Sequence, residues 1–231
     1  MARRKKQKTI SNVRNLIAKL SPKSVIAEQY RTLRTNIEFS SVDEKLQTIL
    51  VTSAGPGEGK TSTISNLAVV YAQQGKKVLL VDADLRKPAV HYTFRIDNIN
   101  GLSNILVGDM SVAEAVNDGG VPGLDVISSG PIPPNPSELL GSNKMKKFLD
   151  LVKGNYDIVL IDTPPVIAVT DAQILANHCD GAILVVRSKH AEYEAVNKAI
   201  DLIKPAKAKL LGTVLNDRDK KESNHYYYYG A

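Results

Sequence analysis

The sequence predicts an α/β protein built on a doubly wound, mostly parallel β-sheet. The chain has 231 residues, of which 43% are hydrophobic and 23% charged, which suits one globular domain with a substantial core. Nearly continuous runs of Val, Ile and Leu favour strands that are covered on both faces of a sheet. Segments with helical patterns separate these runs, as crossover connections between parallel strands require.

The expected strands are the apolar runs, and a helix follows the first of them from Lys60. The runs lie at residues 48–52, 77–82, 124–128, 156–162, 181–186 and 210–216. Ahead of them, a helix is expected at about 24–40, where Ile26, Tyr30, Leu33 and Ile37 form one apolar stripe that can dock on the domain. The proline-rich segment 131–136 predicts a rigid loop that leads to a helix start at Ser137.

Two terminal segments lie outside the expected domain, which spans residues 21–218. Residues 1–20 form a basic arm that we expect to be disordered, and its cations supply much of the net charge of +6. Such an arm can be solvated, lie on an anionic membrane face or touch nucleic acid, and we favour the first two. Residues 219–231 form a flexible tail that is polar and then ends in a tyrosine cluster.

The composition argues against several classes of protein. No run approaches the roughly 18 apolar residues of a membrane-spanning helix, and no apolar signal core follows the basic start, so we expect a cytoplasmic protein. Cys179 is the single cysteine, which excludes an internal disulfide and an iron–sulfur carrier with paired cysteines. We expect it to be an inert, partly buried thiol.

A glycine-rich segment between the first strand and the next helix predicts a phosphate-binding loop. After Ala54, which replaces the usual first glycine, the residues expected to contact nucleotide are Gly55, Pro56, Gly57, Glu58, Gly59, Lys60, Thr61 and Ser62. Backbone N–H groups of such a loop wrap around phosphate oxygens, while the following helix directs its positive end at the same charge. Lys60 reaches the outer phosphates and the Thr61 hydroxyl is a ligand for magnesium. The loop therefore predicts binding of ATP with Mg²⁺.

Carboxylates close two of the later strands. Asp82 ends the run at 77–82, Asp84 follows two residues later, and Asp162 ends the run at 156–162. Ligands of open α/β sheets gather at the carboxyl ends of the strands, so these side chains converge on the loop if their strands neighbour the first. A single aspartate at a strand end is more often a helix cap, but three of them beside a phosphate loop indicate a reaction site.

Together these features resemble the bacterial tyrosine kinases, or BY-kinases, of capsule and exopolysaccharide production, which are P-loop NTPases of the MinD/ParA-like superfamily. The resemblance covers essentially the whole chain. It rests on the loop, on residues 79–88, which look like the second Walker-A-type motif, and on residues 158–165, which look like Walker B. A helix motif, Glu28-Gln-Tyr-Arg31-Thr-Leu-Arg34, and the closing tyrosines match two further family features.

The resemblance implies a role for each site residue. Lys60 and Thr61 would bind phosphates and magnesium, Asp84 and Asp162 would help to hold the metal, and Asp82 would be the base for an incoming tyrosine hydroxyl. Whether Asp82 or Asp84 is that base stays open, because geometry decides it. Asn216, after the last strand, occupies the place where related proteins contact adenine, although a turn explains that residue equally well.

The helix motif and the tail suggest an assembly. Glu28, Arg31 and Arg34 step by three and are expected to face away from the docking stripe. Our hypothesis is that Glu28 of one subunit meets Arg31 or Arg34 of the next in a closed ring. Each subunit then phosphorylates a neighbour's tail in trans, at Tyr226, Tyr227, Tyr228 and Tyr229, and the phosphates release it. The alternatives are a solvated face with local ion pairs and a merely sticky terminus.

The resemblance is to the Firmicute type, in which the kinase is a separate chain, and it implies further partners. These are a transmembrane adaptor of the polysaccharide co-polymerase type, which would activate the chain at the inner face of the cell membrane, and a cognate tyrosine phosphatase. No nucleic acid is expected. The runner-up function is a MinD/ParA-like positioning ATPase, but members of that class usually place a second lysine near the loop start, where residues 53–56 have none.

Overall fold

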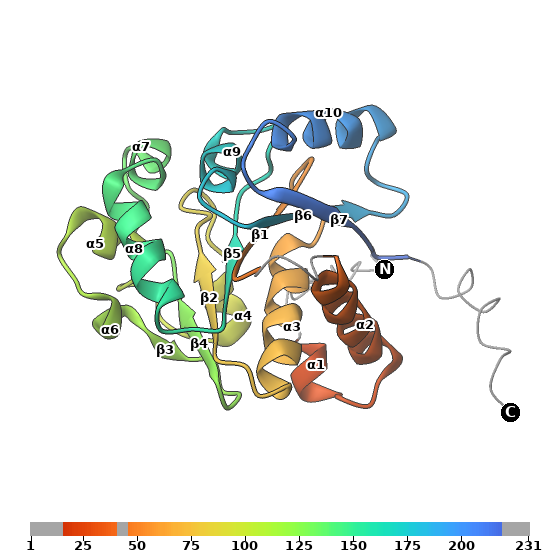
Figure 1. Cartoon of the computed structure of the whole chain (residues 1–231), viewed down its shortest axis with the longest axis horizontal. Coiled ribbons are helices and arrows are strands. Elements are labelled where there is room, and N and C mark those ends of the chain that lie inside the picture. Colours follow the sequence, from red (N-terminus) through yellow and green to blue (C-terminus); the bar gives the residue numbers. More distant parts are fainter. Residues whose placement is uncertain (1–15, 41–45, 219–231) are drawn as a thin grey trace, which may run out of the picture.

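The computed structural model describes residues 16–40 and 46–218, and it has the predicted doubly wound, mostly parallel sheet (Figure 1). The strand order is β3-β4-β2-β5-β1-β6-β7. Every pairing is parallel except that of β3 with β4, a short edge pairing that the sequence did not predict. The strands are β1 (Thr48–Ser53), β2 (Val78–Asp82), β3 (Asn117–Asp118), β4 (Leu124–Ile127), β5 (Ile158–Asp162), β6 (Gly181–Arg187) and β7 (Lys209–Asn216).

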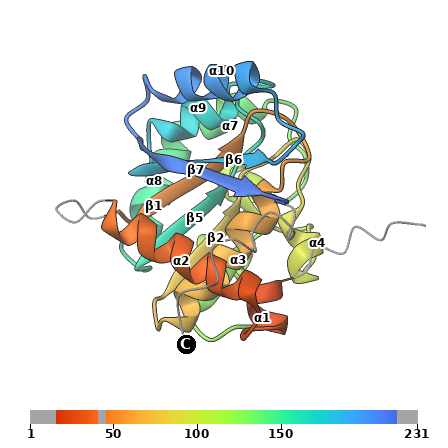
Figure 2. The same ribbon diagram turned by 90° about the vertical axis from the view of Figure 1, so that its right-hand side faces the viewer.

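Helices cover the two faces of the sheet, as Figure 2 shows. One layer contains α1 (Ile17–Leu20), α2 (Val25–Phe39), α3 (Lys60–Gln73) and α4 (Val90–Phe94). The other contains α5 (Leu102–Val107), α6 (Val112–Ala115), α7 (Pro136–Leu140), α8 (Asn143–Lys153), α9 (Asp171–Ala176) and α10 (Tyr193–Ile203). The proline-rich loop does lead into a helix, with Pro136 in its first turn.

Successive residues of the central strands enter opposite cores. In β1, Leu50 packs with the α5–α10 layer, whereas Ile49 and Val51 pack with the α1–α4 layer. This explains why the central strands read as continuous apolar runs. The expectation of two covered faces is wrong for β7, an edge strand in which Leu215 is 56% exposed.

The folded part of the chain begins before the boundary expected at residue 21. Leu16 and Ala18 are buried, and helix α1 is tied to α3 through its backbone. Asn66 Oδ1 accepts from Ala18 N at 2.9 Å, and Gln73 Nε2 donates to Ala18 O at 3.0 Å. The charges before them hid these few apolar residues in the sequence. Residues 1–15 lie outside the described residues, as do the tyrosines of the tail.

Helix α2 docks through most of the predicted stripe. Ser24 caps it by accepting from Ala27 N, Ile37 is buried, and Tyr30 and Leu33 are partly buried. Ile26 is 40% exposed, however, and the fully buried residue of that turn is Ala27. A small side chain allows closer approach of the helix, which the spacing of large apolar residues could not reveal.

Two expectations from composition can be compared with the structure. No helix within the described ranges is long and apolar enough to cross a membrane. Cys179 is buried rather than partly buried, and burial together with the Asp180 carboxylate raises the pKa of its thiol to about 12. The thiol therefore stays protonated, in keeping with an inert role.

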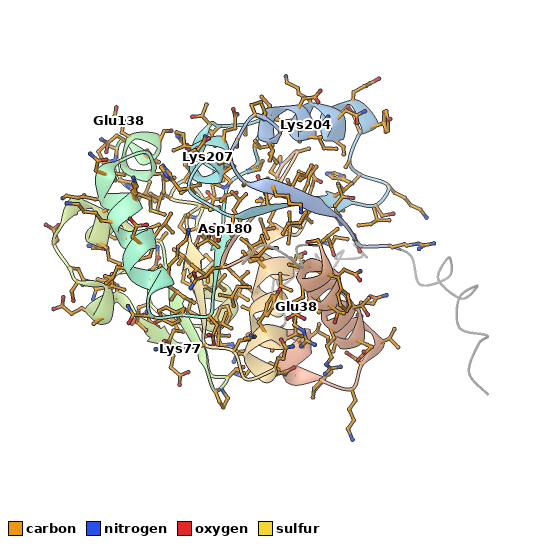
Figure 3. All side chains as sticks on the ribbon, in the orientation of Figure 1. Glu38, Lys77, Glu138, Asp180, Lys204 and Lys207 are labelled. Atoms are coloured by element: carbon orange, nitrogen blue, oxygen red, sulfur yellow. The ribbon has the colours of Figure 1, made fainter. Side chains whose placement is uncertain are left out.

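We expect Asp180→Ala to destabilise the fold by about 2–3 kcal/mol, because it removes the acceptor that holds the start of β1. Asp180 Oδ2 accepts from Gln47 N at 3.0 Å, Thr48 N at 2.7 Å and Thr48 Oγ1 at 2.8 Å. Figure 3 labels this residue and also Lys204, which follows the end of α10. Urea denaturation at pH 7 measures the difference.

The pH dependence gives this prediction a second test. Partial burial alone would raise the pKa of Asp180, but its hydrogen bonds with Thr48 and Gln47 hold it below the ordinary 3.8. The stabilisation is therefore complete above the unfolded-state pKa and is lost as the pH falls through the lower, folded-state pKa. Asp201→Ala is the control, because Asp201 makes only a surface pair with Lys204. Equal losses in the two variants would contradict the prediction.

Candidate nucleotide and phosphotransfer site

The loop between β1 and α3 has the backbone form of an anion cradle. Gly57 and Gly59 have φ of 77° and 96°, in the left-handed region that favours glycine. Helix α3 begins directly after them at Lys60, so its positive end points at the loop. Pro56 and Gly57 are exposed at the rim. The loop can therefore receive phosphate oxygens from solvent.

The carboxylate of Glu58 supports the loop from within. Its Oε1 accepts from Gly55 N at 2.5 Å and its Oε2 accepts from Arg187 N, in β6, at 3.2 Å. The residue is only 2% exposed. The side chain of Glu58 thus points into the protein, and only its backbone faces the cradle.

Asn216 lies at the site, but its side chain contacts the loop itself. Nδ2 donates to the Glu58 carbonyl at 2.9 Å, which ties the end of β7 to the phosphate loop. Beside it, Asp217 pairs with Arg187 at 2.9 Å. The structure therefore gives Asn216 a bracing contact that the sequence did not predict, and its contact with adenine stays a prediction.

We expect Gly59→Ala to weaken ADP binding by at least about tenfold. A Cβ at this position would overlap Asn216 Nδ2, so the brace between β7 and the loop must shift. Alanine at a positive φ costs about 1–2 kcal/mol in addition. Calorimetric titration with ADP measures the affinity, and urea denaturation measures the stability.

Gly75→Ala is the matched control for this change. Gly75 has a φ of 88°, and a Cβ there meets nothing within 4 Å. It follows the far end of α3, so the backbone strain is similar while the nucleotide loop is untouched. The prediction fails if both variants lose stability alike and both retain the ADP affinity of the parent chain.

The three predicted aspartates converge at the carboxyl ends of β2 and β5. Asp82 and Asp162 are register partners, and β5 pairs directly with β1, whose end carries the loop. Strand β2 lies one strand further from β1. Thr61 Oγ1 donates to Asp162 Oδ2 at 2.6 Å, so the two predicted metal ligands from distant segments are in contact.

Asp82 is fully buried and organises the turn that follows it. Oδ2 accepts from Ala89 N and Val90 N, both at 3.0 Å, and Oδ1 accepts from Asp84 N at 3.2 Å. Burial, reinforced by the negative charge of Asp162, raises the pKa of Asp82 to about 8. The structure therefore holds a carboxyl group with high proton affinity beside the loop.

Asp84 faces the phosphate loop from the same turn. Burial raises its pKa, and the backbone N–H groups of Lys87 and Arg86 and the charge of Lys60 oppose that shift. The hydrogen bond from Lys87 N measures 3.0 Å. Lys60 is itself 8% exposed and lies close enough to stabilise the ionised carboxylate.

The donor set fits a magnesium ion that arrives with a nucleotide. In the part of the chain that the structure describes, no three His, Cys, Asp or Glu residues form a metal-binding group by themselves. Mg²⁺ needs only one or two protein oxygens when phosphates and water complete its shell. The Thr61 hydroxyl and the Asp162 and Asp84 carboxylates are oxygen donors of this kind, at the mouth of an anion cradle.

Sequence reasoning missed three residues at the edge of the site. Arg86 Nε donates to Asp171 Oδ2 at 2.8 Å, and Arg86 Nη2 donates to Asp171 Oδ1 at 3.1 Å and to Ser137 Oγ at 2.8 Å. Ser137 Oγ in turn donates to Asp171 Oδ1 at 2.7 Å. Asp171 opens α9 and reads as an ordinary helix-start acid. Arg86 lies 85 positions earlier, and a single sequence does not reveal that the two residues form a pair.

The side chains of the helix motif, Glu28, Arg31 and Arg34, agree only in part with the expectation that they face away from the docking side. Glu28 is exposed and pairs with Arg31 of the same helix at 2.7 Å, as the local alternative predicted. The expectation that Arg34 faces away from the docking side is wrong, because its Nη1 donates to the Val70 carbonyl of α3 at 3.0 Å. A long arginine side chain reaches back across the helix to an unsatisfied carbonyl of α3.

Comparison with known proteins shows which proteins this chain is related to. Residues 46–215 match a protein family described as the AAA domain. The tyrosine-protein kinase YwqD of Bacillus subtilis (strain 168) is 51% identical over 218 residues, which cover 94% of this chain and 92% of that protein.

Solved structures agree with this relationship. The chimerical protein CapA2B2 superposes with a TM-score of 0.86 at 44% identity, over 89% of this chain and 90% of that chain. The septum site-determining protein MinD of Pyrococcus horikoshii OT3, complexed with Mg-ADP, superposes with a TM-score of 0.63 at 25% identity, over 76% and 72%. The MinD likeness reflects the shared nucleotide-binding fold. Near-complete coverage and high identity to the kinase show that this chain belongs to the bacterial tyrosine-protein kinases.

Proposed function

We propose that this chain transfers the γ-phosphoryl group of ATP to tyrosine hydroxyls, with Mg²⁺ as cofactor. The observation that carries the proposal is the placement of Asp82, a carboxyl group whose pKa is raised to about 8, beside Asp162, which bonds Thr61 of the loop. A proton acceptor next to a phosphate and metal site is what phosphotransfer to a hydroxyl requires.

The residues divide the work as follows. Backbone N–H groups of the loop and Lys60 hold and neutralise the phosphates, and Thr61, Asp84 and Asp162 hold the metal. Mg²⁺, when bound, supplies positive charge that offsets the charge developing on the transferred group. The tyrosine oxygen forms the new bond to phosphorus as the bond to the ADP oxygen breaks, and Asp82, in its ionised form, accepts the hydroxyl proton.

Geometry bears on the choice between Asp82 and Asp84. The Asp84 carboxylate accepts from Lys87 N and lies near Lys60, which favours the ionised form that a metal ligand needs. Asp82 has a pKa raised to about 8 but is fully buried, which weighs against its direct contact with an incoming hydroxyl. Asp82→Asn should abolish the rise in rate with pH that reflects ionisation of the base. Asp84→Asn should instead raise the Mg²⁺ concentration needed for half-maximal rate. The reverse pattern would exchange the two roles.

For the acceptor, we propose the tyrosine cluster 226–229 of a neighbouring copy, presented in a closed ring. Glu28, Arg31 and Arg34 would make the ring contact. In the single chain, Arg31 pairs with Glu28, and exposed pairs of this kind contribute little, so exchange for a contact between subunits costs little. Arg34 would have to give up its part-buried bond to the Val70 carbonyl.

Two experiments test the acceptor and the ring separately. Phosphopeptide mapping after incubation with ATP and Mg²⁺ should find the label on Tyr226 to Tyr229, and a chain with Phe at all four positions should lose most of it. Unchanged phosphotyrosine would exclude the tail as the main acceptor. Sedimentation of a Glu28, Arg31 and Arg34 to Ala triple variant should show smaller species. A ring that persists would exclude the helix motif as its contact.

The regulatory partners are also part of the proposal. A transmembrane adaptor of the polysaccharide co-polymerase type would recruit the chain to the inner face of the cell membrane and activate it for control of capsule or exopolysaccharide synthesis, and a cognate tyrosine phosphatase would reset the tail. Membrane fractionation with and without the co-expressed adaptor is the direct test. Kinase that remains in the soluble fraction in both cases would refute recruitment.

A further inference from the structure

Arg86, Asp171 and Ser137 form a closed hydrogen-bonded cluster beside the phosphotransfer site. The guanidinium binds both carboxylate oxygens of Asp171, at 2.8 and 3.1 Å, and the Ser137 hydroxyl bridges the two at 2.8 and 2.7 Å. The Asp171 side chain is 0% exposed and that of Arg86 is 37% exposed. Two parallel bonds fix both the position and the plane of the guanidinium.

The cluster is connected to Asp84 through a single residue. The Arg86 side chain is anchored on Asp171, while the backbone N–H groups of Arg86 and Lys87 act on the Asp84 carboxylate. The turn 83–88 is fixed again at its far end, where Ala89 N donates to Asp82. Loss of the Arg86 anchor therefore removes one of the contacts that hold this turn and its amides in place.

The anchors come from the helical layer that does not carry the phosphate loop. Ser137 lies in α7 and Asp171 is the first residue of α9. Lys60, by contrast, is the first residue of α3, which packs on the opposite face of the sheet. The cluster thus locates the Asp84 turn against a part of the fold that nucleotide binding leaves alone.

We propose that Arg86, Asp171 and Ser137 are positioning residues that fix the turn 83–88, so that Asp84 presents its carboxylate to the nucleotide-bound metal. This rests on the proposed role of Asp84 as a metal ligand. An ion pair with one buried partner is a poor device for stability alone, because desolvation of the buried Asp171 offsets much of the attraction. It does fix direction, and an arginine does so better than a lysine, whose ammonium is a point charge without a planar fork.

The test is the gain in ADP affinity that Mg²⁺ produces, measured by calorimetry with and without the ion. Outer-shell partners of metal ligands typically change metal affinity about 10- to 100-fold. We expect Arg86→Ala and Asp171→Asn to reduce the gain at least about tenfold, Arg86→Lys to restore part of it, and Ser137→Ala to reduce it about threefold. Affinity for ADP without Mg²⁺ should stay within twofold, because the phosphate loop is untouched.

A second readout needs neither metal nor catalysis. Amide hydrogen exchange of the segment 84–88 in the metal-free chain should accelerate at least about tenfold in Arg86→Lys, while the exchange of the loop 55–60 stays unchanged. Tyr156→Phe is the matched control. It removes another partly buried bond, from Tyr156 Oη to Asp125 at 2.8 Å, at the opposite end of β5, and both readouts should stay at the parent value.

The outcomes separate this inference from the proposed function. If Asp84→Asn leaves the Mg²⁺ gain intact, the metal role of Asp84 is wrong and the inference falls with it. If Asp84→Asn abolishes the gain but folded Arg86→Ala and Ser137→Ala retain all of it, positioning alone is overturned. An equal loss in Tyr156→Phe also overturns it, because general destabilisation then explains the effect. Should Asp171→Asn not fold, the other two variants decide.

Discussion

Lys60→Met will lower the rate of phosphotransfer by at least about 10²- to 10³-fold while the fold remains intact. Lys60 is the first residue of α3 and lies at the mouth of the cradle, where it also stabilises the ionised Asp84. Its charge acts on phosphoryl oxygens as they gain charge in the transition state, and loss of one such fixed donor costs a factor of this size. Methionine has a similar length and no charge, so packing in this 8% exposed position is retained.

The measurement is the initial rate of phosphate transfer from labelled ATP at saturating Mg²⁺, together with the melting temperature. Lys87→Met is the matched control. Lys87 is exposed three residues after Asp84 and contacts it only through its backbone N–H, which the substitution keeps. A Lys60→Met rate within tenfold of the parent, or an equal loss in the control, would show that the charge of Lys60 is not central to the reaction.

Asp82→Asn will lower the transfer rate by about 10²- to 10⁴-fold, the range for removal of a general base. It will also change how the stability of the metal-free chain depends on pH. The pKa of Asp82 is raised from 3.8 to about 8 by burial and by Asp162, so between these values the folded state keeps a proton that the unfolded state has released. The stability of the parent chain therefore falls as the pH rises through this window.

The variant lacks this titration, so its stability should fall less over the same pH range. Between pH 6 and pH 8, the free energy of unfolding of the parent chain should fall by on the order of 2 kcal/mol more than that of the variant. The slope is the quantity to compare, because the asparagine amide also disturbs the bond from Asp84 N by a constant amount. Urea denaturation at several pH values, in the presence of a chelator, gives both slopes. Parallel curves would mean that Asp82 is ionised in the folded chain at pH 6.

The parts of the site that could be located from the sequence are those whose residues all lie within one short segment. Residues 55–61 need only each other, a preceding strand and a following helix to form a cradle. Asp82 and Asp162 could be placed because parallel strands bring their carboxyl ends to one edge. Which strands are neighbours was not readable, and the structure answers it with β5 between β1 and β2.

What the sequence could not give depends on pairs distant in the chain or on the reach of single side chains. Arg86 lies in the motif at 79–88, but nothing in that segment points to Asp171, and the two become partners only in the folded chain. Helical spacing gave the direction of the Arg34 Cβ but not the path of the long side chain beyond it, which returns to α3. Residues 16–20 were read with the charges before them, although two apolar side chains suffice to dock α1.

The inward-pointing carboxylate of Glu58 bears on how nucleotide is admitted. The Glu58 carboxylate accepts hydrogen bonds from Gly55 N and Arg187 N, and its carbonyl accepts one from Asn216. Contacts within the protein thus fix the shape of the cradle. A binding site formed in advance spares the ligand the entropy of ordering a loop, and association then proceeds without waiting for a conformational step. We therefore expect the rate of ADP release to depend on the contacts between ADP and the loop rather than on a rearrangement of the loop.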